Sequence, residues 1–245
     1  MSKEKEWFGE WFDSPFYHIL YKNRDNTEAR TFIDNLCIHL GFSSQDKILD
    51  LACGKGRHAI YLNEKGFDVT GIDLSPENIK YASQFSNAKL SFYIHDMREV
   101  FAYDQFDYVL NIFTSFGYFD SVEEHKSAIL AAANALKNRG KLVVDFLNTY
   151  KVVNHLVPLE EKQVDDILFY ITKEINGDGY IVKKIDFEHG GKSYHYQEKV
   201  KAIRRVEFLE FFKLAGLSCI ELLGDYDLQP YQQEISDRMI FIVEK

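Results

Sequence analysis

The sequence predicts an α/β fold in which helices cover both faces of a mostly parallel sheet and an antiparallel β insertion follows the fifth strand. Strand patterns alternate with helix patterns over residues 1–147, and such units need right-handed crossovers between parallel strands. A glycine turn at 53–56 joins the first strand directly to its helix. Turn-rich segments at 176–179 and 189–191 then separate three β-rich runs, as hairpin turns do.

The elements of the parallel region follow from apolar spacing and from boundary residues. Ser75 is suited to cap a helix and Pro76 to occupy its first position, while Ser121 and Glu124 form a capping box for a later helix. The expected helices are 26–41, 57–65, one that starts after Ser75, and 121–137, and the expected strands are 47–52, 67–72, 89–94, 106–112 and 141–147.

The pattern changes after residue 147. The runs 167–175, 180–188 and 192–203 are rich in β-formers and predict antiparallel strands. Helical spacing returns at 206–214, and two last strands are expected at 218–223 and 238–243. No repeat or Pro/Ser-rich linker separates these parts, so we expect the insertion to pack on the core.

Composition and charge narrow the class of protein. The 245 residues carry 29 basic and 38 acidic side chains, a net charge of −9 that disfavours nucleic-acid binding in bulk. Three cysteines without C-x-x-C spacing, Cys37, Cys53 and Cys219, indicate neither a disulfide framework nor a zinc site. The N-terminus mixes charges with aromatics, and no long apolar run follows, so we expect a cytoplasmic protein that does not span a membrane.

Glycines and carboxylates gather at the end of the first two strands. Gly54 and Gly56 let the backbone approach a ligand at a helix N-terminus, and Asp73 ends the second strand, where a carboxylate can accept from two adjacent hydroxyls. Read literally, this is a dinucleotide fingerprint, with a plain tight turn as the alternative. Asp50 favours a ligand with a cationic group over a dinucleotide, because a buried carboxylate suits a positive charge and would repel a pyrophosphate.

With Asp50 included, the chain resembles the class I S-adenosylmethionine-dependent methyltransferases, in particular their bacterial small-molecule branch. Their first motif has the form D-x-G-C-G-x-G, and residues 50–56 read Asp-Leu-Ala-Cys-Gly-Lys-Gly, with Ala52 in place of one glycine. Segments 69–76, 96–97 and 106–111 are similar to the following motifs, in the same order. The resemblance implies a Rossmann-like, seven-stranded sheet whose last strand is antiparallel.

The resemblance also implies S-adenosylmethionine as the cofactor and assigns residues to it. Asp50 would lie near the ammonium, Asp73 would bind the ribose, Asp96 would accept from the adenine amino group, and Arg24 would pair with the carboxylate. The residues expected to bind the cofactor are Tyr21, Arg24, Asp50, Ala52, Gly54, Gly56, Asp73, Leu74, Asp96, Met97 and Asn111. A solvated surface arginine is the alternative for Arg24.

The change from alternating strands and helices to β-rich runs, and back, predicts the domain boundaries. Residues 1–45 are expected to form a helical cap segment, residues 46–156 and 204–245 the cofactor-binding core, and residues 157–203 an antiparallel insertion over the acceptor site. Aromatic side chains of this region are the candidates for acceptor contacts: Phe116, Tyr118 and Tyr194.

Methyl transfer from a sulfonium is an in-line displacement, for which a catalytic base is optional. No spacing singles out such a base among its candidates: His18, His58, His195, Tyr194 and Tyr196. No clustered His or Cys pattern indicates a metal site. We expect a small-molecule acceptor. Three alternatives stay open: an NAD-binding oxidoreductase, a cofactor-binding protein without turnover, and an RNA methyltransferase that uses the basic residues at 199–205.

Overall fold

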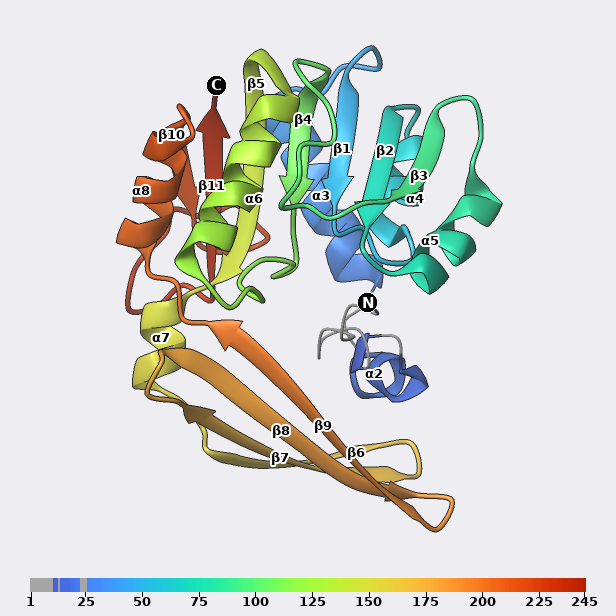
Figure 1. Cartoon of the computed structure of the whole chain (residues 1–245), viewed down its shortest axis with the longest axis vertical. Helices are drawn as coiled ribbons and strands as arrows, with labels where there is room; N and C mark the ends of the chain where they lie inside the picture. Colours follow the sequence, from blue (N-terminus) through green and yellow to red (C-terminus); the bar gives the residue numbers. More distant parts are fainter. Residues whose placement is uncertain (1–10, 13, 23–25) are drawn as a thin grey trace, which may run out of the picture.

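The computed structural model describes residues 11–12, 14–22 and 26–245, apart from the side chains of His18 and Asn26. These described residues build two sheets (Figure 1). The larger has seven strands in the order β10 (Ser218–Leu223), β11 (Arg238–Glu244), β5 (Leu136–Leu147), β4 (Phe106–Asn111), β1 (Lys47–Leu51), β2 (Asp68–Asp73) and β3 (Leu90–Ile94). Strand β11 is antiparallel to both of its neighbours, and every other pair is parallel.

Helices cover both faces of the seven-stranded sheet because its strands alternate apolar side chains between them. On one face lie α3 (Asn26–Leu40), α4 (Arg57–Glu64) and α5 (Pro76–Ala82), followed by the short η1 (Ser83–Phe85). On the other lie α6 (Val122–Ala135) and α8 (Arg205–Leu214). In β1, Ile48 packs toward the first helix group and Leu49 toward the second, as the two-residue period of a strand dictates.

Local signals in the sequence fix most of the element boundaries. The side chain of Ser75 accepts from the backbone of Asn78, and Ser121 with Glu124 forms the predicted capping box. The largest difference lies between α6 and β5. Helix α6 ends at Ala135, two residues earlier than predicted, and β5 begins at Leu136 rather than at residue 141, because Leu136 is extended, pairs with Phe106 and is completely buried.

The second sheet has four antiparallel strands: β6 (Leu159–Val164), β7 (Ile167–Ile175), β8 (Tyr180–His189) and β9 (Lys192–Lys201). The fold class predicted from the sequence is therefore confirmed, including the insertion after the fifth strand. Strand β6 and the short α7 (Thr149–Asn154) were not predicted. Strand β6 reads Leu-Glu-Glu-Lys-Gln-Val, a polar composition that hides its strand character.

The N-terminal helix α2 (Pro15–Leu20) packs on one face of the second sheet, between this sheet and the larger one (Figure 1). Its contacts form a third apolar cluster with residues of β6 to β9. The insertion leaves and re-enters the core at neighbouring points, since Thr149 Oγ1 donates to the Ile203 carbonyl over 2.6 Å. Within the described residues, no helix is both long enough and apolar enough to cross a membrane.

Candidate cofactor site

The carboxyl ends of β1, β2 and β4 bring three predicted polar residues to one edge of the large sheet. Strand β1 lies between β2 and β4, with Asp50 opposite Gly71 on one side and Leu110 on the other. Asp73 and Asn111 end the two neighbouring strands. The connections that follow β1 and β4 leave in opposite directions, toward β2 and toward β5, and open α/β sheets bind ligands in the crevice that results.

The turn after β1 is held in left-handed backbone conformations. The φ angles of Ala52, Gly54 and Gly56 are 57°, 55° and 80°. Glycine is required at position 56, because a Cβ atom there would lie 2.8 Å from the ring of Phe92. Alanine at position 52 adopts the same conformation at a steric cost, so this position carries backbone strain where the family motif has glycine.

Asp73 is oriented by backbone donors on both of its oxygens. Gly54 N donates to Oδ2 over 2.8 Å, and Ser75 N donates to Oδ1 over 2.9 Å. The side chain is partly exposed at the sheet edge. Because each carboxylate oxygen has two lone pairs, both can still accept from a hydroxyl group, as ribose binding requires.

Two buried oxygen atoms at this edge accept no hydrogen bond from any described residue: Asp50 Oδ2 and Asn111 Oδ1. Both side chains are at least 98% buried, so neither oxygen is satisfied by bulk water. Burial, with the nearby Asp73 carboxylate, raises the pKa of Asp50 to about 7. An ammonium group would supply the missing donors and the compensating charge, so these residues fit the amino-acid end of S-adenosylmethionine.

The residues expected at the adenine differ in their exposure and in the contacts that they already make. Leu74 is 44% exposed and offers an apolar contact, whereas Met97 is partly buried against the core. Asp96 is bound by Arg98, whose Nη2 lies 2.7 Å from Oδ2 and which also pairs with Glu124 at 2.6 Å. An adenine amino group would thus share Asp96 with an arginine that the sequence did not single out.

Of the two N-terminal candidates, the structure describes Tyr21. Tyr21 packs on the second sheet, where its hydroxyl donates to Glu198 Oε1 over 2.6 Å and accepts from Lys183. Trp11 Nε1 donates to the same oxygen over 2.7 Å. Sequence reasoning missed Glu198 and Lys183, because an alternating strand does not reveal which of its charges a distant helix covers. Arg24 lies outside the described residues.

The predicted acceptor residues have three different surroundings. Phe116 is 2% exposed and packs among core aromatics, with Phe208 at 5.6 Å between ring centroids. Tyr118 meets Phe12 edge to face at 5.4 Å, which joins the segment after β4 to the N-terminal segment. Tyr194 stacks on Phe187 at 5.1 Å within the second sheet.

Two histidines considered as bases have clear environments. Burial, and then the adjacent Arg57, lowers the pKa of His58 to about 3, and the ring stacks 4.8 Å from that of Phe113. His58 is therefore neutral near pH 7. His195 lies on the exposed side of β9 with Asp186 at 2.6 Å. The side chain of His18 is not described.

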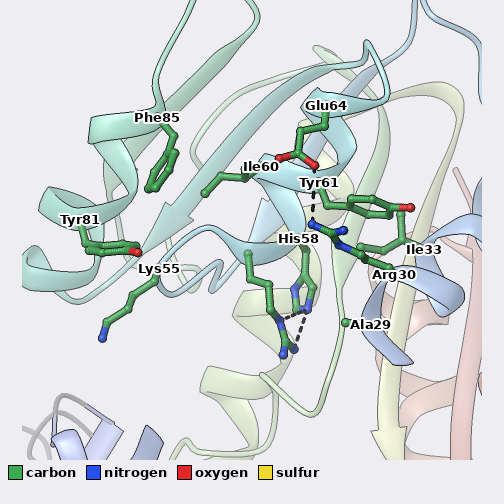
Figure 2. Close-up of a pocket in the computed structure, with 11 residues that line it drawn as sticks. Ala29, Arg30, Ile33, Lys55, His58, Ile60, Tyr61, Glu64, Tyr81 and Phe85 are labelled. Atoms are coloured by element: carbon green, nitrogen blue, oxygen red, sulfur yellow. Dashed lines mark hydrogen bonds and ion pairs between the residues drawn. The ribbon is translucent and has the colours of Figure 1, made fainter. Parts of the chain in front are cut away.

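A cavity of about 340 Å³ lies over the outer side of α4, between α3 and α5 (Figure 2). Arg30 and Tyr61 line one side, and Tyr81 and Phe85 the other. Lys55, from the glycine turn, reaches its rim. Among the described residues predicted to bind the cofactor, none lines this cavity, so it is separate from the site at the sheet edge.

Comparisons with known proteins agree with this geometry. Residues 48–140 match a family described as a methyltransferase domain. The chain is 30% identical to the putative methyltransferase YqeM of Bacillus subtilis over 218 residues, which span 85% of this chain and 87% of the relative. It is also 30% identical to the glycine/sarcosine N-methyltransferase of Aphanothece halophytica over 245 residues, which span 93% and 85% of the two chains.

A solved structure has the same fold. The S-adenosylmethionine-dependent methyltransferase of Clostridium acetobutylicum superposes with a TM-score of 0.80 at 22% identity, and covers 94% of this chain and 97% of its own. The chain belongs to the S-adenosylmethionine-dependent methyltransferases. Its cofactor is S-adenosylmethionine, and its activity is methyl transfer.

Proposed function

We propose that this methyltransferase transfers the methyl group to an amine nitrogen of a small molecule. The observation that carries the proposal is the enclosure of the sheet edge by the second sheet, by α2 and by the segment after β4. A relative that spans nearly the whole chain is named a glycine/sarcosine N-methyltransferase, which supports nitrogen as the acceptor atom.

Three contacts enclose this side of the molecule. Lys201 N donates to the Gly117 carbonyl over 2.7 Å. The buried hydroxyl of Tyr180 donates toward the carbonyls of Phe119 and Asp120, at 2.9 and 3.0 Å. The contact of Phe12 with Tyr118 adds the N-terminal segment. A sheet edge covered in this way favours a small acceptor over RNA, in agreement with the net charge of −9.

The covered face of the second sheet carries Lys162 and, beside it, two ion pairs that we call the charged row: Glu160, Lys173, Lys183 and Glu198. They share this face because Lys173 and Glu198 both lie opposite Lys183, and Glu160 lies opposite the inward-facing Ile171. The ion pairs measure 2.6 Å for Lys173 with Glu160 and 3.7 Å for Lys183 with Glu198. The row itself has zero net charge and Lys162 adds one positive charge, so this half-buried polar face suits a small polar acceptor.

S-adenosylmethionine supplies a methyl group already activated on a positively charged sulfur. The chain's own residues then have to bind the cofactor and the acceptor, orient them, and exclude water. We assign the amino-acid end to Asp50, Asn111 and the turn at 52–56, the ribose to Asp73, and the adenine to Leu74, Asp96 and Met97. In this assignment residues 46–156 and 204–245 form the cofactor-binding core, and residues 157–203 cover the acceptor.

Transfer of a labelled methyl group from S-adenosylmethionine tests the proposal. The acceptor panel contains small primary and secondary amines, with matched alcohols, thiols and a transfer RNA as comparison. We expect label in amines only, and less of it with the Asp73→Ala variant at low cofactor concentration. Label in RNA, or in alcohols or thiols alone, contradicts the proposal. Tight binding of S-adenosylhomocysteine with no transfer to any acceptor supports a binding protein instead.

A further inference from the structure

Arg238 lies at the edge of the large sheet that carries the cofactor site. It is the first residue of β11, and because β11 is antiparallel to β5, it pairs with Leu147 at the carboxyl end of that strand. Its Nη2 donates to Thr114 Oγ1 over 2.7 Å. Thr114 follows Asn111 by three residues, so the guanidinium group lies on the acceptor side of the edge, next to the end of β4.

A buried carboxylate holds this arginine in place. Asp145 is completely buried and its Oδ1 accepts from Arg238 Nε over 2.7 Å, with Nη2 at the same distance. Its Oδ2 accepts from Phe113 N over 2.7 Å and from the Tyr226 hydroxyl over 3.2 Å. The carboxylate is thus saturated with donors, and the guanidinium plane is fixed on one side.

Asp145 also fixes an unusual turn after β4. Phe113 and Thr114 both have left-handed backbone conformations, with φ angles of 59° and 58°. Two consecutive non-glycine residues in this region are strained, and such strain persists only where surrounding contacts determine the conformation. Asp145 supplies them, because its carboxylate accepts from Phe113 N and its backbone carbonyl accepts from Thr114 N over 3.1 Å.

One edge of the guanidinium group stays available. An arginine has five N–H donors, and Arg238 uses those of Nε and Nη2 on Asp145 and Thr114. Its Nη1 has no hydrogen-bond partner among the described residues, although the side chain is only 18% exposed. The anchored guanidinium group thus presents the two N–H donors of Nη1, on a permanently charged group, on the side of the sheet edge where the acceptor would lie.

We propose that Arg238 Nη1 binds a carboxylate group of the acceptor, so that the substrate is a small amino acid. A carboxylate is the acceptor-only group that best satisfies these donors, and an amine without it would leave them unpaired. The anchored guanidinium would then fix the acceptor at one end while its nitrogen faces the methyl group. This inference rests on the proposed function, since it names the class of amine.

The test compares carboxylates with matched amides. Rates of methyl transfer are measured for glycine and sarcosine against glycinamide and sarcosinamide, with the wild type, Arg238→Gln, Arg238→Lys and the exposed control Arg205→Gln. We expect the wild type to prefer the carboxylates in kcat/KM. We expect Arg238→Gln to lower kcat/KM for the carboxylates about 10- to 100-fold and for the amides less than about threefold.

Each outcome decides the matter. If Arg238 had a structural role alone, Arg238→Gln would lower kcat/KM equally for the carboxylates and the amides. That result contradicts the inference. The inference is also contradicted if the wild-type enzyme methylates amides or simple amines with the same kcat/KM as amino acids. In that case the proposed function still holds, whereas absence of transfer to every amine contradicts both. Binding of S-adenosylhomocysteine should change less than about threefold in Arg238→Gln, because this residue faces the acceptor.

Discussion

Asp73 lies two residues beyond Gly71, the β2 partner of Asp50, and its carboxylate adds to the effect of burial in raising the pKa of Asp50. Burial is the larger cause, and together they bring the pKa of Asp50 to about 7. Each carboxylate has a different environment: Asp50 is buried with an unsatisfied oxygen, and Asp73 is partly exposed and oriented by two backbone donors. The site therefore holds one carboxylate that titrates near neutral pH.

Cofactor binding should depend on this titration. A cationic ammonium group favours the ionised form of Asp50, so binding should strengthen as the pH rises toward and past 7. With a pKa of about 7, the ionised fraction grows roughly tenfold between pH 6 and pH 8, and we expect a similar gain in affinity for S-adenosylhomocysteine. Calorimetry across this range measures it. The Asp50→Asn variant should bind more weakly and show a flat profile, and an equally steep profile in that variant contradicts the assignment.

The stability of the ligand-free protein should respond in the opposite direction. The pKa of Asp50 is about 7 in the folded chain, against an ordinary value of 3.8. Between these values the folded protein keeps a proton that the unfolded chain has released. The free energy of unfolding therefore falls as the pH rises from about 4 to 7, and Asp50 accounts for about 2–4 kcal/mol of that fall. Urea unfolding of wild type and Asp50→Asn at pH 5 and pH 8 isolates this contribution as the difference between the two proteins.

Removal of the ribose-binding carboxylate should weaken the cofactor complex. The Asp73→Ala change should cost about 1–3 kcal/mol of binding free energy for S-adenosylhomocysteine, through lost charge-assisted hydrogen bonds. Asp68→Ala is the matched control, because Asp68 begins the same strand at the opposite edge of the sheet. Equal affinities of the two variants would remove Asp73 from the site.

Ala52 offers a test of stored backbone strain. Its φ angle of 57° costs an alanine about 1–2 kcal/mol, and glycine loses about 0.5–1 kcal/mol more than alanine in conformational entropy on folding. We expect Ala52→Gly to raise the free energy of unfolding by about 0.5–1 kcal/mol. The control is Ala88→Gly, in an exposed turn without a positive φ. It should leave stability unchanged or lower it, and a similar gain at both positions excludes strain as the cause.

Glu198 should hold the N-terminal segment on the second sheet. The Glu198→Ala change removes the acceptor of Trp11 and Tyr21 and leaves Lys183 without its carboxylate, which should lower the free energy of unfolding by about 1–3 kcal/mol. Trypsin should then cleave faster at the exposed Lys22. The exposed Glu188→Ala on the same sheet is the control, and identical cleavage of both variants rules out this role.

The parts of the fold that depend on local patterns could be predicted from the sequence. The capping box at Ser121, the hairpin turns near 176–179 and the alternation of strands with helices are all encoded over a few residues. The convergence of Asp50, Asp73 and Asn111 follows from topology, since the carboxyl ends of neighbouring parallel strands meet at one edge.

Contacts between distant segments could not be predicted in the same way. Arg238 and Asp145 are 93 residues apart in the chain, and neither belongs to a local motif. Glu198 and Trp11 are 187 apart, and only the covered face of the second sheet brings them together. Strand β6 is polar, so its pairing with β7 decides its structure more than its own sequence does.

The two crossing points of the insertion, joined by the hydrogen bond from Thr149 to Ile203, bear on how such enzymes diversify. Because the chain departs and returns at one place, the proposed insertion of residues 157–203 can lengthen, shorten or be exchanged without any change in the path of the strands that carry Asp50 and Asp73. If the second sheet covers the acceptor as we propose, its exchange would change acceptor specificity and leave the cofactor-binding core unaltered.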